Sequence, residues 1–183
     1  TSLDVSGRML EQLSASARRE GLTVETVCAP ADQPPEAAFD AVVERLALWT
    51  LPDPAAALSA WRRVTVPGGM LLVVESLWTG GSIGDALRRR ARKLLHRRLP
   101  PEHHGAYNSE LSAGLPLMRE PFPNRYLQEI EAAGWRNLRL TRMRDIEFAR
   151  LVAMGRLEQL CGTNPHYAIT AEAPAVTAEP AQD

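Results

Sequence analysis

The alternation of short apolar runs with segments of helical periodicity constrains the fold of this chain more than any other feature. Residues 39–43 and 70–75 are short and apolar, as strands buried on both faces of a helix-covered parallel sheet must be. Between them, apolar residues recur on one helical face from position 55 to about 64. This order predicts an α/β protein with a doubly wound parallel sheet, whose ligands bind at the carboxyl ends of the strands.

The other segments extend the same alternation. Ser6 is a suitable N-cap for a first helix. Gly134 is a residue type that commonly ends a helix, and it follows a later helical segment. We predict helices over 6–20, 123–133 and 145–160, strands over 22–28, 135–143 and 165–171, and a Pro-rich loop over 29–38. Residues 82–99 are basic and amphipathic and 100–122 are irregular, which favours a lid, and the tail from 172 is expected to be disordered.

Composition bounds the class of protein. A chain of 183 residues can bury one substantial core, and a net charge of -1 creates no general field that would attract nucleic acid or membrane. Cys28 and Cys161 lack metal-site or redox spacing. Neither a signal peptide nor an apolar run long enough to span a membrane is present, so we expect a cytoplasmic protein.

Four sequence pieces carry chemistry when they are considered together. They are Asp4-Val5-Ser6-x-x-Met9-Leu10, Phe39-Asp40-Ala41-Val42-Val43, Leu48-Trp49-Thr50-Leu51-Pro52-Asp53-Pro54 and Trp61-Arg62-Arg63-Val64-x-x-Pro67-Gly68-Gly69-x-Leu71-Leu72. Their order and spacing resemble class I S-adenosylmethionine-dependent methyltransferases of the ubiquinone/menaquinone-biosynthesis-like, type 11 group. The resemblance covers roughly residues 1–78. It implies a Rossmann-like sheet with a helical lid, S-adenosylmethionine as cofactor, and methyl transfer to a small-molecule acceptor.

The resemblance also implies a division of the chain. Residues 1–78 would be a partial cofactor-binding core, 79–122 a lid over the acceptor, 123–171 the segment that completes the sheet, and 172–183 a tail. The sequence leaves a homo-oligomer open.

The implied cofactor contacts come mainly from the start of the chain. Asp4 would accept both ribose hydroxyls, because two carboxylate oxygens match a vicinal diol, although an Asp before a helix is more often an N-cap. Val5 and Met9 would pack against adenine, with plain core packing as the alternative. Asp32 would take the place of the family's adenine-binding acid or be a solvated loop residue. Arg45 would hold the cofactor carboxylate or form a surface salt bridge.

The acceptor would lie beside aromatic side chains. Trp49 and Trp78 would wall an apolar pocket or pack in the core or lid, and Tyr107 would reach the acceptor from the lid. His103 and His104 are weak candidates for a general base, since methyl transfer often needs only alignment. Adjacent histidines without further ligands at metal spacing make a zinc site improbable.

We predict that the basic stretch 87–99 is a solvated helix face. Its functional alternatives are binding of an anionic acceptor, an acidic membrane surface or RNA. Aromatic residues for base stacking are not interleaved with the basic ones, so no nucleic acid is expected.

The main departure from the family is at the front. The family has strand order 3-2-1-4-5-7-6 and a glycine-rich loop after its first strand, and this chain shows neither that strand nor that loop. Either a longer native chain or a partner subunit supplies them, which we favour, or the two half-sheets re-pair. The rival function is a non-catalytic, methyltransferase-like binding or assembly module, or an inactive truncated fragment.

Overall fold

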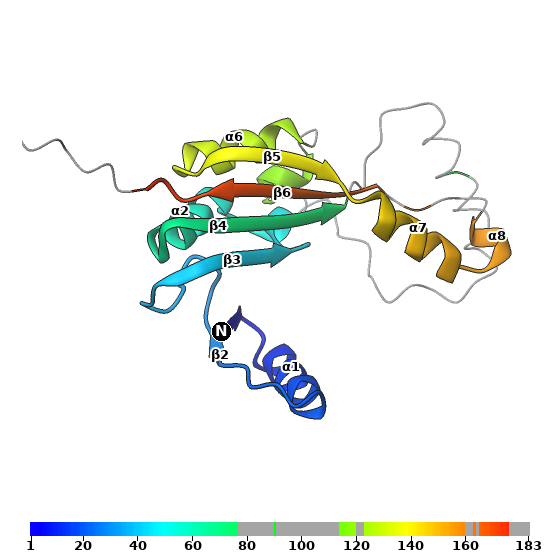
Figure 1. Ribbon diagram of the computed structural model, residues 1–183, viewed down its shortest axis with the longest axis horizontal. Helices are drawn as coiled ribbons and strands as arrows, with labels where there is room; N and C mark the ends of the chain where they lie inside the picture. The colour runs from blue at the N-terminus through cyan, green and yellow to red at the C-terminus, as the bar shows by residue number, and fades with distance from the viewer. Residues whose placement is uncertain (77–89, 91–113, 120–122, 160–162, 164, 176–183) are drawn as a thin grey trace, which may run out of the picture.

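Helices and strands alternate along the described part of the chain (Figure 1). The computed structural model describes residues 1–76, 90, 114–119, 123–159, 163 and 165–175. The strands are β1 (Ser2–Asp4), β2 (Thr26–Cys28), β3 (Phe39–Arg45), β4 (Thr65–Ser76), β5 (Arg136–Arg142) and β6 (His166–Glu172). The helices are α1 (Gly7–Arg19), the 3-10 helix η1 (Leu48–Thr50), α2 (Pro54–Arg63), α5 (Pro116–Arg119), α6 (Asn124–Ala132), α7 (Arg144–Ala153) and α8 (Arg156–Gln159).

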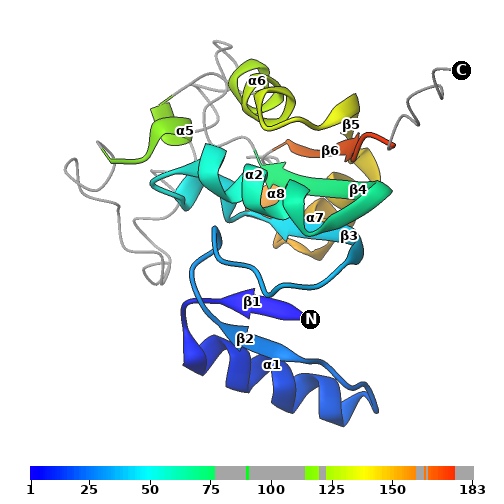
Figure 2. The ribbon, with the colours of Figure 1, turned by 90° about the vertical axis from the view of Figure 1, so that its left-hand side faces the viewer.

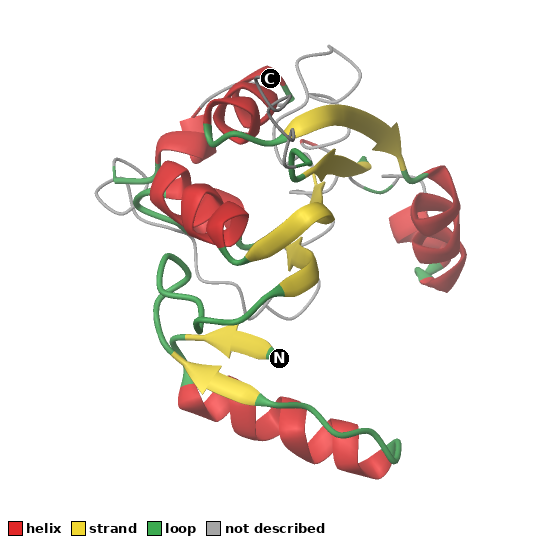
Figure 3. Cartoon of the chain, turned by 60° about the vertical axis from the view of Figure 1, so that its left-hand side comes forward, coloured by secondary structure: helices red, strands yellow, loops and turns green. Residues whose placement is uncertain are grey.

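The strands form two separate sheets. β3, β4, β6 and β5 make a four-stranded sheet in that order, in which β3 and β4 are parallel and β6 runs antiparallel to both of its neighbours. β1 and β2 pair in parallel as a second sheet, which Figures 2 and 3 show beside β3. These two orders match the prediction from the resemblance, in which strands 3 and 2 lie on one side of strand 1 and strands 4, 5, 7 and 6 lie on the other. Among the described strands, the half-sheets have not re-paired.

The core lies between the four-stranded sheet and helices α2 and α6. Leu71, Val73 and Ile169 from the sheet meet Leu58 and Ile130 from the helices, and all are fully buried. Trp135, between α6 and β5, is also fully buried, and its Nε1 donates to the Leu58 carbonyl oxygen at 3.1 Å.

The smaller sheet carries its own helix. Ser6 caps α1 as predicted, accepting from the Met9 N–H at 3.3 Å, and α1 turns Leu10 and Ala17 inward. The loop after β2 reaches the main core, because the Trp61 Nε1 donates to the Ala31 carbonyl oxygen at 2.7 Å.

Three predicted elements need correction. The strand over 22–28 is only β2, since β1 offers three residues to pair with it. The helix over 145–160 is two helices, α7 and α8, with Gly155 between them. The tail begins later than 172, because Glu172 ends β6 and the Ala173 N–H donates to the Gly69 carbonyl oxygen at 2.8 Å. The predicted loop over 29–38 is confirmed.

The expectation that residues 39–43 are buried on both faces is wrong. Val43 is 67% exposed and Ala41 is exposed as well. α2 and α6 cover one face of the main sheet, while α1 packs on β1 and β2. The outer side of β3 therefore has no described helix against it.

The Pro67-Gly68-Gly69 segment lies inside β4 rather than before it. The register with β3 shifts between Phe39 and Ala41, so the segment forms an irregularity that lets the strand continue. Gly69 lies so close to its neighbours that a Cβ there would be 2.6 Å from the Thr65 side-chain Cγ2 and 2.8 Å from the Asp40 carbonyl oxygen.

Gly69→Ala is expected to lower the free energy of unfolding by about 1–3 kcal/mol, because the methyl group forces β3 and β4 apart. Urea denaturation measures it. Gly7→Ala is the matched control, since a Cβ at Gly7 meets nothing within 4 Å. Equal stabilities of the two variants would contradict the close packing of Gly69.

Candidate functional site

Polar side chains stand at the carboxyl ends of four strands. Asp4 is the last residue of β1, Cys28 the last of β2 and Arg45 the last of β3. Glu44 precedes Arg45, and Glu75 is the penultimate residue of β4. Strand ends of this kind are where α/β sheets bind ligands.

Asp4 shapes the turn between β1 and α1. Its Oδ1 accepts from the Ser6 N–H at 2.7 Å, and its carbonyl oxygen accepts from the Ala29 N–H at 3.2 Å. The turn therefore uses one carboxylate oxygen and ties β1 to the loop after β2. The second oxygen accepts no hydrogen bond from the described residues, which leaves it available to a ligand.

Val5 and Met9 flank this carboxylate and lie in solvent. Val5 is 72% exposed and Met9 is 55% exposed, so the core-packing alternative does not describe them. Two apolar side chains beside a carboxylate acceptor form a surface suited to a flat, partly apolar group with hydroxyls.

The other predicted site residues are spread out. Asp32 is exposed in the loop after β2, and Arg45 is exposed at the end of β3. Trp49 is half-buried in η1 and packs against the main core. Four predicted site residues lie outside the described residues: Trp78, His103, His104 and Tyr107. The basic stretch 87–99 is described only at residue 90, and the predicted lid 79–122 only at residues 90 and 114–119.

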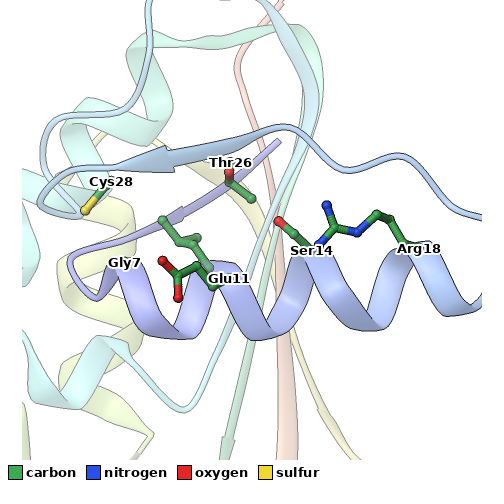
Figure 4. A pocket seen from close by; sticks show the side chains of 7 residues that line it. Gly7, Glu11, Ser14, Arg18, Thr26 and Cys28 are labelled. Carbon is green, nitrogen blue, oxygen red and sulfur yellow. The ribbon is translucent and has the colours of Figure 1, made fainter.

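A groove of about 400 Å³ runs between α1 and β2 (Figure 4). Gly7, Glu11, Ser14 and Arg18 line it from α1, and Thr26 and Cys28 line it from β2. Leu10 of α1 also lines it. It contains none of the predicted contact residues.

Sequence reasoning missed a pair of buried carboxylates. Glu44 is 6% exposed and Glu75 is 2% exposed. Glu44 Oε1 accepts from the Ala47 N–H and from the Leu48 N–H, the latter at 2.9 Å, so it holds the start of η1. Glu44 Oε2 and Glu75 Oε1 are buried and have no hydrogen-bond partner among the described residues. The only sequence signal was an acidic residue at the end of each of two apolar runs.

Burial changes the protonation of this pair. It raises the pKa of Glu44 to about 7. Burial, followed by the nearby Glu44 carboxylate, raises the pKa of Glu75 to about 8. The pKa of Tyr126 on α6 is also raised, first by burial and then by both carboxylates, so its hydroxyl lies near the pair.

Metal-ligating side chains do not gather into a site among the described residues. No group of three or more His, Cys, Asp or Glu side chains there could hold a metal ion. None of the helices in the described ranges has the length and apolarity needed to cross a membrane.

The comparisons with known proteins agree on a single fold. Residues 1–73 match the family described as methyltransferase domain, and no curated protein matches the chain. A SAM-dependent methyltransferase from Methanosarcina mazei is similar with a TM-score of 0.57 and 19% identity, over 94% of this chain and 81% of that one. The N-methyltransferase NodS from Bradyrhizobium japonicum, in complex with S-adenosylhomocysteine, has a TM-score of 0.50 and 13% identity, over 94% and 65%.

The same fold also carries a different printed activity. The [4+2]-cyclase SpnF is similar with a TM-score of 0.58 and 19% identity, over 94% of this chain and 66% of that one. At such identities the likeness establishes the fold, and the reaction has to be argued from the site.

Proposed function

We propose that the chain is a class I S-adenosylmethionine-dependent methyltransferase that methylates a small-molecule acceptor, a proposal supported by the match of residues 1–73 to the methyltransferase domain family and by the fold. In this proposal the adenosine half of the cofactor lies at the end of β1. The observation that supports it is the Asp4 carboxylate, of which Oδ1 accepts from the Ser6 N–H, beside the exposed side chains of Val5 and Met9.

The residues at this place fit an adenosine. Asp4 would accept from the ribose hydroxyls, and Val5 and Met9 would cover one face of the adenine, burying side chains that otherwise remain in water. Asp32 would accept from the adenine amino group. For the methionine half, the described residues offer Arg45 as a partner for the carboxylate.

Methyl transfer depends mainly on the alignment of the acceptor with the methyl group of the cofactor. When bound, S-adenosylmethionine supplies a methyl group on a positively charged sulfur, which needs no further activation. The protein's task is then to orient the acceptor and exclude water. Trp49 on η1 would wall the acceptor side, with Trp78 and Tyr107 as further contacts and His103 or His104 as an optional base. The cytoplasmic location and a homo-oligomer remain predictions.

Calorimetric titration of the chain with S-adenosylhomocysteine tests the proposal, because this product binds without an acceptor. Micromolar binding supports the enzyme. A folded chain that does not bind would instead support a non-catalytic binding or assembly module.

Asp4→Ala is expected to weaken S-adenosylhomocysteine binding by about 1.5–3 kcal/mol, the cost of losing hydrogen bonds to a charged acceptor. The same titration measures it. Asp53→Ala is the matched control, since the Asp53 Oδ1 caps α2 by accepting from the Ala56 N–H at 2.9 Å, in a similar turn far from β1 in the sequence. Unchanged affinity of the Asp4 variant would remove Asp4 from the site.

A further inference from the structure

Glu44 and Glu75 project from the same face of the main sheet. Glu44 is the register partner of Val73 in the parallel pair β3 and β4, and partners at one level share a face. Glu75 lies two residues beyond Val73 in the same strand, so its side chain is on the same face of the sheet as that of Val73. Val73 is fully buried in the core beneath α2 and α6, and the two carboxylates therefore close this core at the carboxyl end of the strands.

The groups around the pair come from three further elements. η1 supplies the backbone N–H groups that bind Glu44 Oε1. α6 supplies Tyr126, whose phenol is influenced by both carboxylates. β6 places Tyr167 as the register partner of Glu75. The described residues place no Lys or Arg in an ion pair with either glutamate.

This leaves two acceptor oxygens, Glu44 Oε2 and Glu75 Oε1, buried and without donors in the described structure. Proteins rarely leave a buried carboxylate oxygen unpaired, because it has lost its water without gaining a partner. No described residue donates to these two oxygens, so a proton or a cation would satisfy the pair. Two carboxylates with no third ligand among the described residues make a poor metal site, whereas a nitrogen carrying several N–H donors can bond both oxygens at once.

We propose that Glu44 and Glu75 form a cation-binding pair that receives the ammonium group of an amine acceptor, and that one carboxylate takes a proton from the ammonium so that the nitrogen lone pair can accept the methyl group. This inference rests on the proposed function and names its substrate class. The position fits, since the pair ends two neighbouring parallel strands, where this fold binds ligands. When the site is empty, a proton held by the carboxyl groups takes the place of the cation.

The protonation of the pair agrees with this exchange. With pKa values raised to about 7 and about 8, the carboxyl groups retain a proton near neutral pH. An ammonium group between them favours the charged carboxylates and lowers their pKa. Binding of the cation therefore releases the proton, and the pKa of the pair falls when the site is filled.

The test is an NMR pH titration of the full chain labelled with ¹³C at the glutamate side-chain carboxyl carbons. Methylammonium chloride is the probe, and sodium chloride at the same ionic strength is the reference. We expect methylammonium to lower the apparent pKa of the Glu44 and Glu75 pair by about one unit. Superimposable titrations in the two salts overturn the proposal.

Two substitutions make the result specific. Glu75→Gln and Glu44→Gln each keep an acceptor oxygen for the backbone donors, and each is expected to abolish the methylammonium effect on the remaining carboxyl. If one variant does not fold, the other carries the test. Glu147→Gln is the control, because the Glu147 carboxylate is already paired with Arg142 at 2.9 Å and its loss should leave the effect intact. An effect that survives in both pair variants overturns the proposal.

The outcome separates this inference from the proposed function. The methylammonium titration needs no cofactor, and the S-adenosylhomocysteine titration needs no amine. Cofactor binding without a methylammonium effect removes only the cation-binding pair. A methylammonium effect without cofactor binding retains the cation site and removes the methyltransferase proposal that gave it a role.

Discussion

Replacing Trp135 by alanine is expected to lower the free energy of unfolding by about 3–5 kcal/mol, the largest effect of any single substitution considered for this chain. The indole is fully buried and its Nε1 donates to the Leu58 carbonyl oxygen at 3.1 Å. Alanine leaves a cavity between α2, α6 and the main sheet and removes this link to α2. Urea denaturation with tryptophan-independent detection, such as far-UV circular dichroism, measures the loss.

Two further variants interpret that loss. Trp135→Phe keeps an aromatic ring but removes the Nε1 donor, so we expect a smaller destabilisation than alanine causes. Phe148→Ala, at a position on α7 that is 66% exposed, should change stability by no more than about 0.5 kcal/mol. If the alanine variants at 135 and 148 were equally stable, Trp135 would not be the centre of the core.

Glu75→Gln is expected to make the protein more stable than the unmodified chain above neutral pH. Because the pKa of Glu75 is raised from 4.5 to about 8 in the folded state, folding favours its protonated form. Its contribution is fully present below pH 4.5 and is lost as the pH rises through 8. The loss is on the order of a few kcal/mol, and glutamine, which stays neutral, avoids it.

Thermal unfolding of both proteins between pH 5 and 9 measures this difference, which should widen as the pH rises. Glu147→Gln provides a control of opposite sign. The Arg142 guanidinium lowers the pKa of Glu147, so that carboxylate stabilises the fold above its unfolded pKa, and its removal should cost stability at neutral pH. Parallel stability curves for the Glu75 variant and the unmodified chain would show that Glu75 is ionised without cost in the folded state.

The elements that short-range signals specify were predicted well. Ser6 starts α1 by accepting from the Met9 N–H, as predicted. Gly134, at a positive φ of 90°, follows the end of α6. In each case the capping side chain or the glycine lies within a few residues of the helix end it determines, so the signal is present in the sequence itself.

Features that depend on distant neighbours were predicted poorly. β3 has the composition of a strand buried on both faces, yet Val43 is exposed because α1 packs on the other sheet. The length of β2 follows from the three residues of β1, and the Pro67-Gly68-Gly69 segment stays within β4 because β3 and the chain after β6 pair with it. None of these partners is near in sequence.

The residues of the candidate site also differ in how well the sequence predicts them. Asp4, Val5 and Met9 could be named from the sequence, because a strand-to-helix turn brings residues four or five apart to one place, and their predicted contacts await the cofactor titration. The Glu44 and Glu75 pair could not, because two acidic residues 31 positions apart become one site only when β3 and β4 align in register. The sequence by itself predicted the order of most elements and the cap of the first helix. Only the tertiary structure decided which polar groups are buried together, because desolvation depends on long-range packing.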